Sequence, residues 1–250
     1  MKLYDLHTHS VLSDGTLTVP ELIAETAKHG YGLGVSDHLF CCNLLTLQNV
    51  DDYLTELERY DVLRGLEANI GENFTLPASL DNRVDYVIAS VHTVKTPQGD
   101  AMPLNPYFCS RAGDEGAPPY TQSFKEDEAK FYLEQITQLI SYDFKNQRVD
   151  ILGHCTVNPF YDALLSNPWL EGWENEIINL CLKHDVAMEI SGLWCCPRKA
   201  MVQKALLKGV KFSFGSDCHT PQHTCNLEYP LQLINELKIP ETQIYLPERR

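Results

Sequence analysis

The sequence lacks any apolar run near the ~20 residues that a membrane-spanning helix requires. It also lacks the C-x-x-C pairs of zinc ribbons and thiol redox motifs, although it contains nine cysteines. An odd number of cysteines cannot pair completely within one chain, which favours a reducing compartment. The first residues enter polar sequence at once and lack the apolar stretch of a signal peptide. We therefore expect a cytoplasmic protein with no membrane partner.

Basic residues are also scarce. The chain has 20 Lys and Arg against 34 Asp and Glu, for a formal net charge of −14. Nucleic acid bound through its phosphates requires clustered Lys and Arg, so a nucleic-acid partner is not expected. A small anionic substrate is compatible with this charge, because bound cations can dominate the field inside one pocket. The sequence does not indicate an oligomeric state.

The chain length of 250 residues fits one large domain, and barrel folds often have this length. Short apolar, β-rich segments, typical of strands buried on both faces, alternate with helical patterns. The expected strands are 2–6, 33–36, 62–66, 86–91, 150–153, 186–190 and 211–215, and the expected helices are 19–28, 51–60, 125–144, 173–184, 199–208 and 229–237. About seven parallel β/α units favour a barrel spanning residues 1–250, with an open doubly wound sheet as the alternative.

Residues 96–123 interrupt this alternation with five prolines, three glycines and little periodicity. A loop longer than about 15 residues inside a compact domain is usually functional or disordered. The segment follows the strand that ends near His92. Two interpretations stay open: a lid or substrate loop inserted in the barrel, or an unstructured insertion.

The first chemical signal is the pair His7 and His9 at the end of the first expected strand. Residues i and i+2 of an extended chain point to the same face, so both imidazoles can reach one point. Two imidazoles suit a borderline metal such as zinc. An H-x-H pattern by itself is not specific.

The other expected strands end in the same way. Six of the nine histidines stand at or just past the carboxyl end of an expected strand, with acidic residues among them. This set comprises His7, His9, His38, Glu67, His92, His154, Asp217 and His219. Packing alone does not explain such placement, and barrel enzymes carry their chemistry at this end of the strands. The pattern predicts a metal-dependent hydrolase.

The ordered motifs HTHS…SDG, SDH, a lone Glu, SVH, GH and GSDCH resemble those of the PHP (polymerase and histidinol phosphatase) family, from Asp5 to about His219. The resemblance implies a distorted (β/α)7 TIM-like barrel that holds up to three divalent ions and hydrolyses phosphoesters. It implies three ligand sets: His7, His9, Glu67 and Asp217; a bridging Glu67 with His92 and His154; and Asp14 with His38 and His219. Some relatives carry His where this chain has Asp14, so the third site can differ in its metal.

Three divalent ions bring six positive charges, and three carboxylates with a bridging hydroxide leave about +2, which suits a phosphomonoester dianion. Mixed imidazole and carboxylate ligands accept zinc, manganese or iron. Phosphate binding also favours an arginine, since a guanidinium holds two phosphate oxygens. Arg198 is the best placed by sequence, ahead of Arg111 and Lys95. The expected catalytic residues are therefore Asp217, Glu67 and Arg198.

The function expected is a phosphoesterase that cleaves a small phosphomonoester, such as histidinol phosphate or a nucleotide, with a metal-bridging hydroxide. An amidohydrolase-like enzyme with a non-phosphate substrate is the alternative, followed by a nucleic-acid exonuclease or a degenerate binding module. Asp37 has two interpretations: it orients the neighbouring His38, as supporting carboxylates often do, or it caps the following turn.

Overall fold

The computed structural model describes residues 2–250. Within this range the main sheet consists, in spatial order, of β1 (Tyr4–Asp5), β2 (Gly32–Val35), β3 (Leu63–Asn69), β4 (Tyr86–Ser90), β7 (Ile151–Leu152), β8 (Ala187–Ser191) and β9 (Phe212–Gly215). Every neighbouring pair is parallel. β9 also returns to β1, because Leu6 N donates to Phe214 O at 2.9 Å and Asp217 N donates to His7 O at 2.8 Å. The predicted seven-stranded barrel is therefore confirmed.

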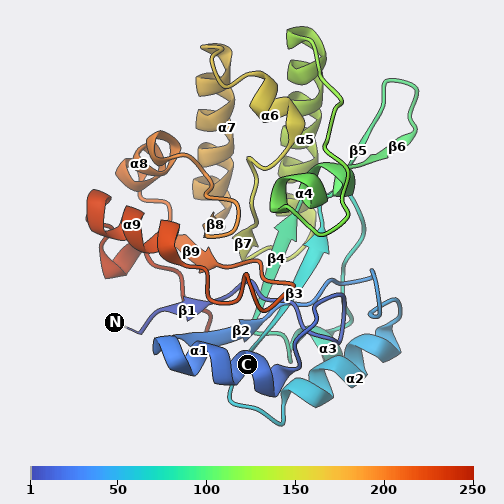
Figure 1. Cartoon of the computed structure of the whole chain (residues 1–250), viewed down its shortest axis with the longest axis vertical. Helices are drawn as coiled ribbons and strands as arrows, with labels where there is room; N and C mark the ends of the chain where they lie inside the picture. The colour runs from blue at the N-terminus through green and yellow to red at the C-terminus, as the bar shows by residue number, and fades with distance from the viewer. Residues whose placement is uncertain (1) are drawn as a thin grey trace.

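Helices cover the outside of this barrel (Figure 1). The six predicted helices are observed as α1 (Val19–His29), α2 (Leu47–Leu57), α5 (Glu126–Asn146), α7 (Trp169–His184), α8 (Lys199–Lys208) and α9 (Glu228–Leu237). α2 begins earlier than predicted because Thr46 caps it, its Oγ1 accepting from Asn49 N at 3.2 Å. The short α3 (Ala78–Asp81), α6 (Pro159–Ala163) and η1 (Glu241–Gln243) were not predicted. Among residues 2–250, no helix is both long and apolar enough to cross a membrane.

Large side chains fill the barrel interior beneath the carboxyl ends of the strands. Leu6, Leu63, Tyr86, Ile88, Ile151 and Ala187 form this inner cluster. The hydroxyl of Tyr86 donates to Leu6 O at 2.5 Å, so its ring crosses the interior. A Cβ at Gly65 would stand 2.3 Å from the ring of Tyr86, which only glycine avoids. The interior of the barrel is therefore filled by packed side chains.

Residues 96–123 contain more regular structure than their composition indicated. β5 (Thr93–Lys95) pairs antiparallel with β6 (Ala101–Pro103), and α4 (Asn105–Ala112) follows directly. Pro106 occupies the first turn of α4, where a proline needs no hydrogen bond from its nitrogen. The expectation of an irregular loop was therefore wrong for the first half of the segment.

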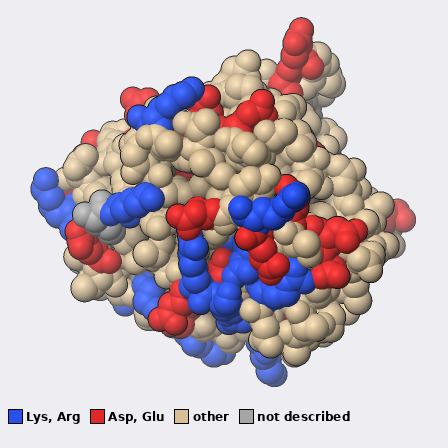
Figure 2. Space-filling model, turned by 90° about the horizontal axis from the view of Figure 1, so that it is seen from below, with Lys and Arg blue, Asp and Glu red and all other residues tan. Residues whose placement is uncertain are grey.

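Charged side chains of both signs share the surface. On the face shown in Figure 2, Lys and Arg lie next to Asp and Glu. Ion pairs such as Arg83 with Glu58 at 2.8 Å and Arg148 with Asp81 at 3.1 Å neutralise basic groups locally. Basic and acidic side chains are therefore interleaved on this face.

Candidate metal centre

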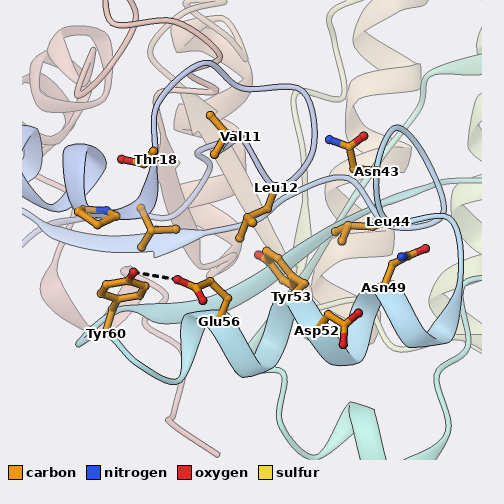
Figure 3. A pocket seen from close by; sticks show the side chains of 12 residues that line it. Val11, Leu12, Thr18, Asn43, Leu44, Asn49, Asp52, Tyr53, Glu56 and Tyr60 are labelled. Carbon is orange, nitrogen blue, oxygen red and sulfur yellow. Dashed lines mark hydrogen bonds between the residues drawn. The ribbon is translucent and has the colours of Figure 1, made fainter.

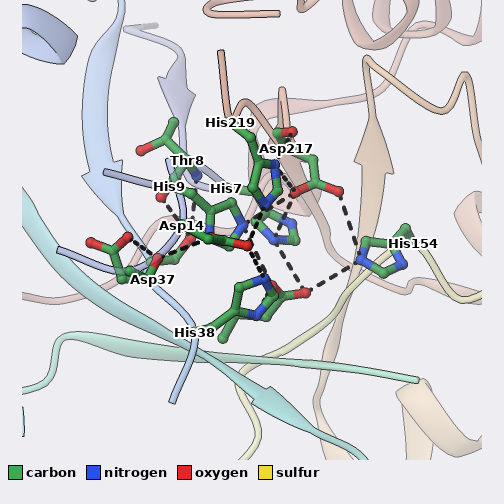
Figure 4. A network of polar contacts seen from close by, with 12 residues as sticks. His7, Thr8, His9, Asp14, Asp37, His38, His154, Asp217 and His219 are labelled. Carbon is green, nitrogen blue, oxygen red and sulfur yellow. Dashed lines mark hydrogen bonds and ion pairs between the residues drawn. The ribbon is translucent and has the colours of Figure 1, made fainter. Parts of the chain in front are cut away.

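The segments that follow the strands converge on a pocket of about 340 Å³ at the carboxyl end of the barrel. All nine predicted ligands reach it or lie directly beneath it, and Figure 4 shows most of them facing a common centre. They come from the segment after β1 (His7, His9, Asp14), from the segments that follow β2, β4 and β7 (His38, His92, His154), from β3 (Glu67) and from the loop after β9 (Asp217, His219). Glu67 lies inside β3, two residues before its end, and so not at the strand terminus that the sequence predicted.

Distances between the ligand atoms fit coordination of shared ions. His7 Nε2 lies 3.3 Å from Glu67 Oε1 and 3.4 Å from Asp217 Oδ1. His9 Nε2 lies 3.2 Å from the same Asp217 oxygen. Two atoms that each bind one tetrahedral ion at roughly 2.1 Å stand about 3.4 Å apart, which is longer than a good hydrogen bond. The spacing is that of ligands around a cation.

Buried polar atoms at the centre lack hydrogen-bond partners among the described residues. They are Nε2 of His7, both ring nitrogens of His9, Nδ1 of His38, both carboxylate oxygens of Glu67 and Oδ1 of Asp217. Burying one such atom unpaired costs about 1–3 kcal/mol, and more if it is charged. So many in one place require a ligand, and imidazole with carboxylate is a donor set that divalent ions accept. The residues present therefore fit the implied metal ions.

Asp14 lies at the open side of the cluster. Its Oδ2 is 3.5 Å from His219 Nε2 and 3.6 Å from His38 Nε2, which brings the three residues of the implied third set together. His9 Nδ1 lies 3.8 Å from Asp14 Oδ1 and joins the same group. His38 Nδ1 is also 3.0 Å from Glu67 Oε2. His9 and His38 therefore each stand between two groups of ligands.

These groups shift one another's protonation. Burial alone would raise the pKa of Glu67, but the imidazoles of His7 and His38 hold it well below its usual range. Burial, followed by repulsion from His219 and His38, lowers the pKa of His9 to about 3. The carboxylate is therefore ionised and this imidazole neutral at pH 7. Those are the states in which both groups bind a metal.

Glu189 of β8 is a functional residue that the sequence analysis missed. Its Oε1 lies 2.6 Å from His7 Nδ1, and its Oε2 accepts from the backbone N–H of His154 at 2.6 Å. Burial lowers the pKa of His7, yet Glu189 and nearby carboxylates hold it well above its usual range. A Cβ at Gly215 would stand 2.4 Å from Glu189 Oε1, so glycine makes room for this contact. The available signal was a single Glu within a fully buried strand.

Other supporting contacts also come from residues that were not predicted. Asn69 Oδ1 lies 2.7 Å from His92 Nδ1. The indole N–H of Trp194 donates to Asp217 Oδ2 at 2.5 Å. Hydrogen bonds to the far side of a ligand fix its orientation and tune its basicity. Several of the predicted ligands are therefore oriented by a hydrogen bond on the side away from the centre of the site.

Asp37 has neither of its expected roles. Its carboxylate accepts from the N–H and the hydroxyl of Ser10, both at 2.7 Å, and from the hydroxyl of Ser13. These contacts anchor the loop that carries Asp14. The partners of Asp37, Ser10 and Ser13, belong to the loop before α1. None of these hydrogen bonds involves the ring of His38 or the turn that follows it.

The structure does not bring the three predicted basic residues to the pocket. The guanidinium of Arg198 makes two hydrogen bonds to the buried Glu174, at 2.6 and 3.0 Å. Arg111 pairs with Asp162 at 3.1 Å, and Lys95 is exposed on the β5–β6 hairpin. Among residues 2–250, no Lys or Arg lines the pocket. Its position in the sequence led us to expect Arg198 at the pocket. In the structure its side chain instead pairs with a buried carboxylate.

The mouth of the pocket is partly aromatic. The ring of Phe108, on α4, lies 5.5 Å from the ring of His154 and 5.6 Å from that of Trp194. Asn105 and Pro103, from the same segment, also line the mouth. Residues of the 96–123 segment therefore line the mouth of the pocket beside the predicted ligands.

A second cavity, of about 490 Å³, lies between the loop before α1 and the helix α2 (Figure 3). Its wall includes Leu12, Leu44 and Tyr53, and Glu56 accepts there from the hydroxyl of Tyr60 at 2.8 Å. None of the clusters of three or more potential metal ligands found within residues 2–250 lies in this cavity. The metal chemistry therefore belongs to the smaller pocket.

Comparisons with known proteins agree with this geometry. The family model for the PHP domain matches residues 5–191. A probable phosphatase of Clostridium acetobutylicum is 27% identical over 255 residues, which cover 97% of this chain and 89% of the relative. Histidinol phosphate phosphatase from Lactococcus lactis, solved with zinc, L-histidinol and phosphate, has a TM-score of 0.61 at 20% identity and covers 96% of this chain and 95% of its own. A Listeria monocytogenes structure reaches a TM-score of 0.65 at 16% identity, covering 89% and 97%. The structural matches share the fold.

Proposed function

Because the chain belongs to the PHP domain family, we propose that it is a metal-dependent phosphoesterase that hydrolyses a small phosphomonoester. One observation carries the proposal. The pocket is lined by the carboxylates of Asp14, Glu67 and Asp217, and among the described residues no Lys or Arg lines it. Such a pocket repels a phosphate group by itself and attracts one when divalent cations occupy it.

We propose up to three divalent ions, zinc, manganese or iron, held by the nine residues in the sets that the family resemblance implied. These are His7, His9, Glu67 and Asp217; Glu67 with His92 and His154; and Asp14 with His38 and His219. Divalent ions supply the Lewis acidity that polarises a phosphoryl group. The orphaned ligand atoms and their spacing support this assignment.

Glu67 is the proposed bridge between two of these ions. Its Oε1 faces His7 and His154, each at 3.3 Å, while its Oε2 faces His9 at 3.4 Å and His38 at 3.0 Å. The two oxygens of one carboxylate therefore point at different groups of imidazoles. An ionised carboxylate in this position would bridge two neighbouring cations, with one oxygen available to each.

The remaining groups orient the ligands and receive the substrate. Glu189 accepts from Nδ1 of His7, so that Nε2 of that ring is directed at Glu67 and Asp217. The rings of Phe108 and Trp194 form an apolar side of the mouth. We propose that the organic part of the substrate packs there, with α4 serving as a substrate-binding cover.

The Lactococcus lactis relative was solved with L-histidinol and phosphate, and histidinol phosphate is therefore one substrate proposed here. Nucleoside monophosphates are the second proposed class, because their planar bases also suit an aromatic mouth. All nine cysteines are free, which supports the proposed cytoplasmic location.

Elemental analysis of the purified protein together with a phosphomonoester panel tests the function. We expect two to three divalent ions per chain and turnover of at least one small phosphomonoester. Amides, lactones and single-stranded DNA are tested beside the phosphomonoesters as alternative substrates. Turnover confined to those substrates would replace the phosphoesterase with an amidohydrolase or an exonuclease, and a metal-free, inactive protein would overturn the proposal.

A further inference from the structure

A pair of adjacent cysteines lies at the mouth of the metal pocket and takes no part in the proposed phosphoesterase chemistry. Cys41 and Cys42 follow β2 and the ligand His38, and both line the pocket. Their Sγ atoms are 3.2 Å apart. Cys42 is exposed and Cys41 is half-buried, so the pair is open to the solvent-filled mouth.

The backbone holds these two sulfurs on the same side. Adjacent side chains of an extended chain point to opposite faces, so facing thiols require an unusual turn. Phe40 and Cys42 both adopt positive φ, at 56° and 54°. Phe40 N donates to Leu44 O and Leu44 N donates to Cys41 O, each at 3.0 Å. The turn is thus closed by its own hydrogen bonds, which present the thiols as one bidentate unit.

The turn is also tied to the metal site. The side-chain amide of Asn43 donates to Ser13 O at 2.7 Å, and Ser13 precedes the proposed ligand Asp14. A molecule held by the two sulfurs would therefore stand beside Asp14 and His38, which line the same pocket.

We propose that Cys41 and Cys42 form a chelating site for thiophilic metal or metalloid ions at the mouth of the active site. Sulfur ligands select soft ions over the hard ions that carboxylates prefer. Two sulfurs that bind one tetrahedral ion at about 2.3 Å lie about 3.8 Å apart, close enough to the observed separation for a small rotation to reach. An ion bound there obstructs the entry of substrate.

A trivalent arsenical is a suitable probe because its reaction requires two neighbouring thiols. With an organoarsenic oxide, two As–S bonds form and the arsenic–oxygen bond breaks. The two thiol protons leave with the oxygen as one water, and no atom is oxidised or reduced.

The chain contains its own control. Cys195 and Cys196 are also adjacent in sequence, but their sulfurs have different surroundings. Sγ of Cys195 donates to Gly192 O at 3.5 Å, whereas Cys196 is buried. The Cys-Cys dipeptide therefore occurs twice. In Cys41-Cys42 the two sulfurs contact each other, whereas in Cys195-Cys196 one sulfur bonds to the backbone and the other is buried.

The experiment treats the metal-loaded protein with one equivalent of phenylarsine oxide and measures intact mass and hydrolysis rate. We expect one adduct, with loss of one water, on the unaltered protein and on Cys195→Ser, and none on Cys41→Ser or Cys42→Ser. The adduct should lower the rate at least tenfold relative to each protein's own untreated rate. 2,3-Dimercaptopropanol should restore the rate, and 2-mercaptoethanol at equal thiol concentration should not.

Adduct formation on Cys42→Ser at the level of the unaltered protein would overturn the site, as would its loss in Cys195→Ser. An adduct at the pair that leaves hydrolysis unchanged would overturn its placement across the mouth. The mass measurement does not depend on any phosphatase activity, so a failure of the proposed function remains distinguishable from a failure of this site. Thermal melting of each variant identifies any protein that has not folded, and for such a variant Ala replaces Ser.

Discussion

Glu189 Oε1 lies 2.6 Å from Nδ1 of His7, and both side chains are about 1% exposed. When Nδ1–H donates a hydrogen bond to Glu189, the neutral imidazole carries its lone pair on Nε2. That atom is directed at Glu67 and Asp217. The second oxygen of Glu189 accepts from His154 N, so one carboxylate supports residues proposed for two metal sites. Glu189 therefore joins β8 to the segments that follow β1 and β7.

We expect Glu189→Gln to weaken metal binding about 10- to 100-fold, since supporting carboxylates contribute this much to the affinity of their ligands. One amide group can accept from only one of the two N–H donors and turns its own N–H₂ toward the other. Competition with a fluorescent chelator measures the affinity. Glu174→Gln is the control, because Glu174 is equally buried but pairs with Arg198 outside the pocket. Equal loss of metal in both variants would mean that Glu189 acts only through stability.

Replacing Glu67 tests the proposed bridge. Glu67→Ala should remove at least one of the bound ions and abolish hydrolysis, because both oxygens face separate groups of imidazoles. Elemental analysis and the hydrolysis rate are the measurements, with the exposed Glu72→Gln as the control. If Glu67→Ala kept both its metal content and its rate, the bridging assignment would be wrong.

Arg198→Ala distinguishes a phosphate ligand from a structural ion pair. The structure predicts a loss of about 1–3 kcal/mol in the free energy of unfolding, because the buried Glu174 loses its charged partner. KM for the substrate should stay within about twofold, since Arg198 does not line the pocket. Denaturant titration and steady-state kinetics measure the two effects. A KM raised tenfold or more, with an unchanged free energy of unfolding, would show that Arg198 does contact the substrate.

Phe108→Ala should raise KM for an aromatic phosphomonoester by about tenfold, corresponding to roughly 1.4 kcal/mol of lost apolar contact. The substrate ring would lose its packing at the mouth, whereas the metal content should not change. Phe131→Ala removes the same side chain from an exposed position on α5 and serves as the control. Equal KM values in all three proteins would show that α4 does not contact the substrate.

Removal of the metals should destabilise the folded protein as well as inactivate it. An ion present at about 100 times its Kd contributes about 2.7 kcal/mol, which corresponds to a Tm difference of about 5–10 °C in a chain of this size. Without ions, the ionised Glu67 and Asp217 are left buried. Differential scanning calorimetry before and after chelation, and again after adding zinc or manganese, gives the comparison. An unchanged Tm with full metal release would contradict a centre of this kind in the core.

Local sequence determined the strand order and the place of the proposed ligands at one end of the barrel. Each of the seven predicted strands overlaps an observed one, and α8 spans 199–208 as predicted. Apolar runs and helical periods are local signals, and parallel strands in a barrel bring all their carboxyl ends to one rim. Residues as distant as His7 and His219 could therefore be assigned to one site without any coordinates.

Tertiary structure alone decided which side chains support that site. Arg198 follows β8 and was expected at the pocket, but it pairs with Glu174 of α7. Glu189 was overlooked, although it contacts His7, a residue 182 positions away in the sequence. Burial makes every charged group seek a partner, and that partner is set by packing between distant elements. Strand periodicity thus locates the proposed metal ligands, while the groups that orient them depend on contacts between distant elements, which no local pattern records.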